Sequence, residues 1–509
     1  MSFEIVNSSV GQRWVDALTR AQSRVDVRVE LKTPAKKVLS VTSNSFLASV
    51  ERNEASVVIN ARVSTRVIFI DENDGYNSEE TTTTFTEKLV LKNPEAIATV
   101  LPSLHVVETR VVDATQPTFV EATSVVDVHL LGVMQRDVTL VAELKGSVET
   151  QKSMVAMPIL RESMSNRFEV EDVIELDRDC AGILGVDCSA HLRDIVVSDG
   201  KFTLKGTVSA NIVATKNVEG QMIYNTYHEF DFAKTITMAT IVADDMVSGS
   251  VAVTAVTMAA SARGGKSELN LDLELLFNGL TVTNQKVETL TDAMSFDHEL
   301  TMEHGTVNGT IAIEQVNINV DVEGNITMPD GAAFISKVLS TNHARITQVN
   351  VVPSDNKITV EGILEAGIVF ECEEKALHSQ TVQVPFSNTA RVDNVTAAHA
   401  ISAGVSLSFC KIRARRGKEL LVDARLGLNL SATTTSAHSA IMSVRQGAVK
   451  STDDSAILIF TATEKETLWD MAKRINISTS EILAQNPGLE QGITAGDKIT
   501  IYRQKVINF

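Results

Sequence analysis

The sequence contains few of the residues that would point to redox or metal chemistry. Only 4 cysteines and 9 prolines occur among 509 residues, and aromatic residues make up 5%. Cys180, Cys188, Cys372 and Cys410 lack the close pair spacing of zinc or redox motifs. We expect four ordinary buried thiols, in a reducing compartment or in a fold that needs no disulfide. Hydrophobic cores must then be built from Val, Ile, Leu, Ala and Met.

An excess of positive charge and a long apolar run are also missing. The 46 Lys and Arg residues stand against 64 Asp and Glu, a formal net charge of −18. This balance argues against nucleic acid or an anionic membrane surface as a partner. No run of about 18 apolar residues occurs, so we expect no transmembrane segment. The first residues have no basic start before an apolar core, so we expect no secretory signal and a cytoplasmic location.

No catalytic constellation stands out in the sequence. G-x-S-x-G and Walker A patterns are absent. Residues 261–267, SARGGKS, lack the spacing of a phosphate loop and are predicted to form a hairpin turn. The acidic run at 71–75 lacks the length and terminal Glu of a calcium loop. We therefore expect no enzyme activity, no catalytic residue, no cofactor and no metal site.

One β pattern occurs three times in the middle of the chain. Each copy begins with a segment rich in Val, Ile and Thr that alternates apolar with polar or small residues, the period of a half-buried strand. A polar turn and a second strand follow, and that strand carries Phe85, Phe232 or Phe386 in register. We predict three long hairpins with the phenylalanine on the inner face. Their first strands are predicted at 56–71, 201–216 and 357–372.

The wide spacing of these copies predicts tandem domains. Copies about 150 residues apart are too far apart for a solenoid, and each is large enough for a core of its own. Strands joined by turns, with few long helices, favour β-sandwiches. The preceding segment, residues 1–24, is expected to contain one short helix with Trp14 and Leu18 on one face. The predicted β domains span residues 25–160, 161–296 and 297–447.

The end of the chain follows a different pattern. After a polar linker at 448–456, residues 457–503 read as strand, helix, helix and strand. Thr467 can cap the first helix through its hydroxyl, and Ser478 or Thr479 can cap the second. Helical spacing places four apolar residues of the first helix on one face. They are Leu468, Met471, Ala472 and Ile475.

This C-terminal unit resembles the LysM domain along its whole length. TLWDMAKRINIS, ILAQNPGL and ITAGDKITIY carry the resemblance, in order and at family spacing. It implies a βααβ fold and a shallow groove between the loop before the first helix and the loop after the second. LysM domains commonly bind N-acetylglucosamine polymers there, such as peptidoglycan or chitin. The binding residues carried over are Lys465, Glu466, Thr467, Leu468, Trp469, Asn486, Pro487, Gly488, Leu489, Ile493 and Thr494.

The first of these loops departs from the family. The usual Gly-Asp-Thr is Lys465-Glu466-Thr467 here. A glycine that lets the backbone approach a sugar ring is thus replaced by a long charged side chain. This change weakens the glycan interpretation and leaves a protein ligand open. Structural roles are the alternative for two of these residues, since the Trp469 ring can pack against the helix pair and Asn486 can end the second helix.

The β units resemble the SPOCS domain of spore-forming bacteria, and the third unit resembles it most. Tandem SPOCS domains followed by one LysM domain are the layout of the SipL-like family of spore coat morphogenetic proteins. The resemblance implies a mainly β chain with three tandem β-sandwich-like domains and a small α+β LysM domain. The segments that carry it in the third unit are MPDGAAFISKVL, KITVEGILEAGIVFEC, VQVPFSNTAR and GKELLVDARLGLNL.

The same resemblance implies a function. It points to a non-enzymatic scaffold or adaptor of spore coat assembly, in the mother-cell cytoplasm at the forespore surface. Its LysM and SPOCS domains would dock protein partners, among them the coat ATPase that forms the basement layer. The alternative is a peptidoglycan-binding cell-wall or cortex protein that holds N-acetylglucosamine-containing glycan through its LysM domain.

Overall fold

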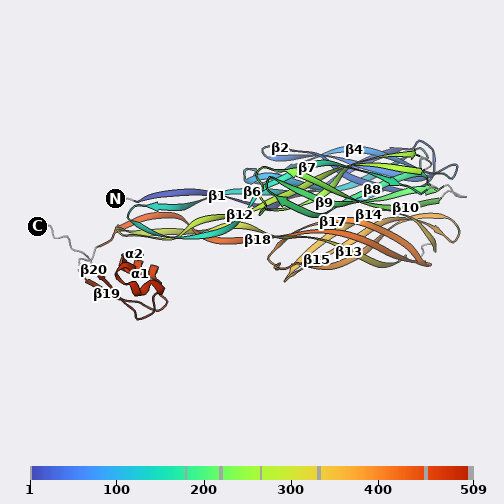
Figure 1. The fold of residues 1–509 in the computed structure, drawn as a ribbon. Helices are drawn as coiled ribbons and strands as arrows, with labels where there is room; N and C mark the ends of the chain where they lie inside the picture. Colours follow the sequence, from blue (N-terminus) through green and yellow to red (C-terminus); the bar gives the residue numbers. More distant parts are fainter. Residues whose placement is uncertain are drawn as a thin grey trace.

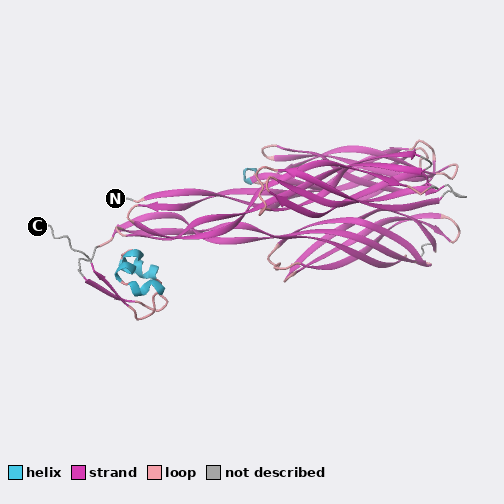
Figure 2. Ribbon diagram, viewed as in Figure 1, coloured by secondary structure: helices cyan, strands magenta, loops and turns pink. Residues whose placement is uncertain are grey.

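Strands form almost the whole molecule, and two short helices lie near the C-terminal end (Figure 2). The structure, a computed structural model, describes residues 3–177, 180–216, 222–263, 266–329, 334–451 and 457–502. A thick block of strands occupies one end, and long ribbons extend from it toward the small helical unit (Figure 1). The predicted fold class, mainly β with a small α+β unit at the end, is confirmed.

The first unit consists of two three-stranded antiparallel sheets, ordered β1-β6-β5 and β2-β3-β4. The first and last strands of the unit pair with each other, from Glu4 opposite Lys145 to Glu30 opposite Phe119. Its elements are β1 (Glu4–Glu30), β2 (Ala35–Arg52), β3 (Ser56–Asp71), β4 (Tyr76–Val90), the 3-10 turn η1 (Pro94–Ala96), β5 (Ile97–Asp113) and β6 (Phe119–Lys145).

The second unit has the same plan, with sheets β11-β12-β7 and β10-β9-β8. The first strand of the unit again pairs with the last over nearly their whole lengths. Its elements are β7 (Val148–Glu175), β8 (Cys180–Ser198), β9 (Lys201–Lys216), β10 (Met222–Thr237), β11 (Met246–Arg263) and β12 (Lys266–Ser295).

The third unit completes the pattern with sheets β13-β18-β17 and β14-β15-β16. In each of the three units, apolar side chains of the two sheets form a shared buried cluster, so each unit is a two-layer sandwich. Its elements are β13 (His298–Thr327), β14 (Ile335–Ser354), β15 (Lys357–Cys372), β16 (Leu377–Arg391), β17 (Ala400–Arg416) and β18 (Glu419–Val449).

The three predicted hairpins are present, and their first strands, β3, β9 and β15, have the predicted bounds. In each hairpin the phenylalanine of the second strand lies opposite a small residue of the first. Phe232 pairs with Gly206, Phe386 with Gly362, and Phe85 with Ala61. A Cβ atom on Gly362 would lie 2.8 Å from the ring of Phe386. The ring thus covers the backbone where the strand has no side chain.

The N-terminal segment corrects one expectation. Residues 4–30 form the strand β1 and not a short helix, and Trp14 lies opposite Met134 of β6. The physical reason is that β6 pairs with this segment along its full length, whereas a short isolated helix is marginal in water. The predicted boundary between the first two domains, at residue 160, lies within β7. The strands of the first unit end with β6, and those of the second begin with β7 after the turn at 146–147.

A shared apolar cluster joins the three sandwiches. Residue 39 of β2, residue 184 of β8 and residue 339 of β14 are each a leucine that is left out of the ladder at a β-bulge. All three leucines belong to this one cluster. Equivalent residues of the three central strands, Ile68, Val213 and Val369, are buried with them. The repeated bulge therefore directs one leucine per unit toward the other two units.

Polar contacts between units also use the bulges. The guanidinium of Arg345 in β14 donates to the carbonyls of Val106 and Val107 in β5, both at 2.7 Å. One terminal nitrogen of Arg167 in β7 donates to the carbonyls of both Leu47 and Ala48 in β2, at 3.0 and 2.9 Å, and the other donates to Glu274. Both acceptor pairs lie where a bulge interrupts the ladder. The planar fork of Arg345 suits two adjacent carbonyls, and each of the two arginines joins one sandwich to another. We call the three sandwiches the heads.

Beyond the sandwiches, the paired first and last strands continue as three two-stranded ribbons, β1/β6, β7/β12 and β13/β18 (Figure 1). We call the bundle of these ribbon ends the stalk. Each ribbon contributes an equivalent residue to the core of the stalk. These residues are Val141, Leu290 and Ile441, and a bulge directly follows each of them. A second set of equivalent residues, three positions further along, is also buried in this cluster. It comprises Leu144, Ala293 and Val444.

Candidate interaction site

The C-terminal unit has the expected order of strand, helix, helix and strand. Its two strands pair from Ile457 opposite Tyr502 to Thr461 opposite Lys498. Met471, Ala472 and Ile475 of the first helix are buried against the strands, as the helical spacing predicts. The elements are β19 (Ile457–Thr461), α1 (Leu468–Ile475), α2 (Thr479–Gln485), the 3-10 turn η2 (Pro487–Gln491) and β20 (Lys498–Tyr502).

Two of the predicted binding residues hold the loop before α1 in place. Thr467 caps α1 in a capping box with Asp470, in which each side chain accepts from the other residue's backbone N–H. Glu466 accepts from the guanidinium of Arg474 at 2.7 Å and from the backbone of Thr463 at 2.9 Å. The hydrogen bond from Arg474 lowers the pKa of Glu466 below its ordinary value. Both side chains therefore stabilise the loop.

The loop after α2 is fixed by two other predicted residues. The side-chain amide of Asn486 donates to the carbonyl of Thr500 at 3.0 Å, and its oxygen accepts from the backbone N–H of Thr500 at 3.0 Å. Thr494 donates its hydroxyl and its backbone N–H to Asp497, both at 2.8 Å. These polar groups join the loop to β20 and to the following turn.

The remaining predicted residues fall into an inward and an outward group. Leu468, Leu489 and Ile493 pack against the buried cluster of the unit. Pro487 and Gly488 are exposed, and so is Lys465. Lys465 has φ 62°, the left-handed conformation that glycine adopts most easily. A long cationic side chain thus projects from a backbone position where the LysM family usually has glycine.

Trp469 has a role that the sequence did not reveal. Its indole N–H donates to the carboxylate of Asp292 in β12, at 2.7 Å. Lys473, one turn further along α1, reaches both oxygens of the same carboxylate at 2.9 Å. Burial raises the pKa of Asp292, but the hydrogen bonds from Lys473 and Trp469 outweigh it and hold the pKa below its usual value. Trp469 and Lys473 therefore bind the stalk.

Further contacts extend this docked face over both helices. Asn476 donates its amide to the carbonyl of Phe296 at 2.8 Å and accepts from Lys450 at 2.9 Å. At the start of α2, the backbone N–H of Thr479 donates to the carboxylate of Glu149 in β7, at 3.1 Å. Met294 of β12 is buried within the apolar cluster of the C-terminal unit. The unit is thus packed onto the stalk end of β7 and β12.

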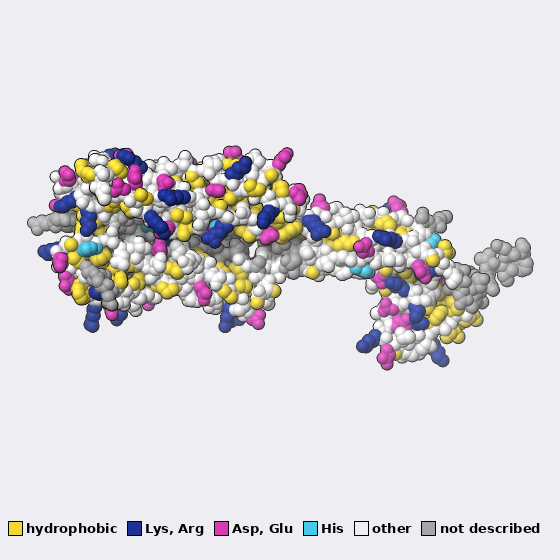
Figure 3. Space-filling model, turned by 180° about the vertical axis from the view of Figure 1, so that it is seen from behind, with side chains coloured by type: hydrophobic (Ala, Val, Ile, Leu, Met, Phe, Trp, Pro, Cys, Tyr) yellow, Lys and Arg dark blue, Asp and Glu magenta, His cyan; other side chains and the backbone are white. Residues whose placement is uncertain are grey.

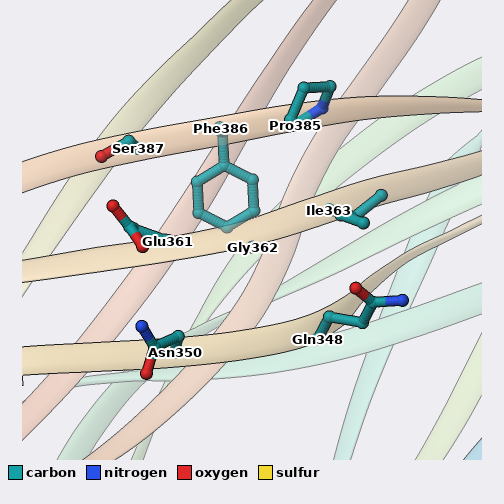
Figure 4. Close-up of a pocket in the computed structure, with 8 residues that line it drawn as sticks. All are labelled: Gln348, Asn350, Glu361, Gly362, Ile363, Pro385, Phe386 and Ser387. Atoms are coloured by element: carbon teal, nitrogen blue, oxygen red, sulfur yellow. The ribbon is translucent and has the colours of Figure 1, made fainter.

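A separate shallow hollow of about 430 Å³ lies on the third unit, where Gln348, Asn350, Gly362 and Phe386 line it (Figure 4). Its floor is formed by the Phe386 ring beside Gly362, the pair already described. Gln348 has φ 53° and lies at a bulge of β14. The hollow follows from this bulge and from the missing side chain at Gly362, and no basic side chain lines it beside the carboxylate of Glu361.

The described part of the chain offers little support for metal or thiol chemistry. Within it, no group of three or more His, Cys, Asp and Glu side chains could hold a metal ion. Burial raises the pKa of the Cys188 and Cys410 thiols to about 12, so both are protonated at neutral pH. His228 of β10 forms a hydrogen bond of 2.6 Å with Asp172 of β7, a contact between the two sheets of one sandwich. Among the described helices, none combines the length and apolar character needed to cross a bilayer.

The fold and its docked C-terminal unit define a class of elongated β proteins built from three alike sandwiches. In a comparison with protein families, residues 335–413 match the family described as SipL, SPOCS domain. This segment runs from the start of β14 into β17, and it includes the hairpin of β15 and β16. The search of curated proteins found no match.

Proposed function

We propose that the chain is a non-enzymatic scaffold or adaptor of spore coat assembly. The observation that carries this proposal is the similarity of residues 335–413 to the SPOCS domain of SipL, in a chain whose other two units repeat the same six-stranded plan. The LysM-like unit lies at the other end of an elongated molecule from the heads (Figure 1). Such a shape suits a protein that joins partners some distance apart.

The partner surface that we propose on the LysM-like unit is formed by its two loops. Lys465 on the first loop and Pro487 and Gly488 on the second are exposed, while the neighbouring polar side chains are used within the unit. A protruding lysine suits a carboxylate on a folded protein surface better than it suits close approach of a sugar ring. By the family resemblance, the partner is the coat ATPase of the basement layer, met in the mother cell at the forespore surface.

Avidity supplies the physical logic of three units and one small domain on a single chain. When several weak docking sites lie on one chain, binding of one site raises the effective concentration of the others near the partner. The overall affinity then exceeds that of any single site. The mixed surface charge fits this mode, because basic and acidic side chains are interspersed over the visible face of the heads, the stalk and the LysM-like unit (Figure 3).

Charge reversal at the exposed lysine tests the proposal. Lys465→Glu in the full-length chain should weaken capture of the coat ATPase about tenfold or more, because a rim contact becomes a repulsion. Lys205→Glu, at an exposed position of β9 in the second unit, is the matched control and should bind like the parent. Equal binding by both variants would rule out the Lys465 loop as the docking surface.

The glycan-binding alternative is favoured by the LysM-like order of elements alone. In that function, the full-length chain would sediment with purified peptidoglycan in a saturable manner, and N-acetylglucosamine oligomers would compete. We expect little sedimentation, since Lys465 occupies the position where the backbone would meet the sugar. Strong, competed sedimentation that Lys465→Glu does not change would favour the cell-wall function instead.

A further inference from the structure

Among the described residues, the contacts of the LysM-like unit concentrate on the tip of the second ribbon, and Lys450, directly after β18, adds one contact with Asn476. The three ribbon tips nevertheless have equivalent positions. The residue directly after the stalk bulge is Glu143 in β6, Asp292 in β12 and Ser443 in β18. Only Asp292 carries the indole and ammonium contacts described above. The three ribbons therefore do not offer the same surface to the unit.

The apolar part of the contact also favours the tip of the second ribbon over the tips of the other two. Met294 of β12 is 2% exposed because the C-terminal unit covers it. The equivalent residues two positions after Glu143 and Ser443 are Lys145 and Arg445, and both are exposed. Burying either cation beneath the helices without a partner would cost more than burying methionine gains. The sequence of the second ribbon tip thus suits the unit, and the sequences of the other two do not.

We propose that the tip of the second ribbon, β7/β12, is a dedicated binding site for the LysM-like unit that fixes this unit in one orientation on the stalk. The site combines Asp292 and Glu149 as acceptors with Met294 as the apolar contact. Its counterpart on the unit is the face of α1 that carries Trp469, Lys473 and Asn476, at helical spacing of four and three residues.

This docking has a consequence for partner binding. The face of α1 that meets the stalk is separate from the exposed residues Lys465, Pro487 and Gly488. The two loops are therefore presented outward while Trp469 is occupied inside the molecule. Fixed presentation lowers the entropy lost when a partner binds. The inference goes beyond the proposed function, because the docking holds whatever ligand the loops take.

The test uses the fact that the chain has only two tryptophans. In a Trp14→Phe background, the fluorescence of the full-length chain reports on Trp469 alone. Asp292→Ala removes a charge-assisted acceptor, so hydrogen exchange at the amide of Thr479 should become about tenfold faster, and acrylamide should quench Trp469 more strongly. Glu143→Ala, at the equivalent place in the first ribbon, is the matched control and should leave both readouts unchanged.

A second variant separates undocking from unfolding. Met294→Lys introduces the residue found at the equivalent position of the first ribbon, and it should release the unit in the same way as Asp292→Ala. In both variants the amides of β19 and β20 should keep their protection, because these strands pair within the unit. The proposal would be overturned if acrylamide quenched Trp469 in these variants no more strongly than in the parent. Loss of protection throughout β19 and β20 would also overturn it, by showing that the tip is needed for folding of the unit and not for docking.

Discussion

The stalk core offers a sharp test of whether the three units behave as one body. Leu290 of β12 is fully buried beside Val141 of β6 and Ile441 of β18, which belong to the other two ribbons. Leu290→Ala removes three carbon atoms from a site that cannot collapse easily, because each ribbon is held by its own ladder. Buried leucine truncations of this kind cost about 3 kcal/mol.

The assay is hydrogen exchange of the full-length chain, followed in peptides of each ribbon. A loss of about 3 kcal/mol corresponds to opening that is roughly 100-fold more frequent. We expect faster exchange in all three ribbons near the stalk core, since Leu290 packs against both neighbours. Lys286→Ala, at an exposed position of the same strand, is the control and should change little. Faster exchange confined to β7 and β12 would refute the reasoning, because it would mean that the ribbons do not stabilise one another.

Two further predictions concern the heads. Phe386→Ala should destabilise the third unit by about 3–4 kcal/mol. Phe85→Ala should cost less, because Phe85 is only half-buried and lies opposite Ala61. Urea unfolding measures both losses of stability, and equal losses would contradict this prediction. Burial lowers the pKa of His343 to about 4. Because this value lies below the unfolded value of about 6.5, stability should be fully present above pH 6.5 and should fall as the pH drops toward 4. His343→Phe should remove that part of the pH dependence, and an unchanged slope in thermal unfolding would contradict the assignment.

The hairpins could be predicted from the sequence because their signal is local. The alternation in 56–71, 201–216 and 357–372 is long enough to mark whole strands, and each has a phenylalanine at the matching place of the next strand. The capping of α1 by Thr467 is equally local, since donor and acceptor lie three residues apart.

What the sequence did not reveal depends on contacts between distant segments. The segment with Trp14 and Leu18, residues 10–23, carries a pattern that also suits a helix, and only its pairing with β6, more than 100 residues away, makes it a strand. Strands usually have 3–10 residues, so a single strand as long as β7 was not expected, and the predicted domain boundary at residue 160 falls inside it. The contact of Trp469 with Asp292 spans 177 residues, and no local pattern encodes it. The candidate loops could be located from the sequence, but the docked face beside them could not.

Binding of the full-length chain to its two candidate ligands tests the central claim most directly. We would titrate the chain with the coat ATPase and, in the same buffer, with N-acetylglucosamine oligomers. The account predicts saturable binding to the ATPase that Lys465→Glu weakens about tenfold or more, with no saturable binding to the glycan. Saturable binding to the glycan, together with no binding to the ATPase, would contradict it.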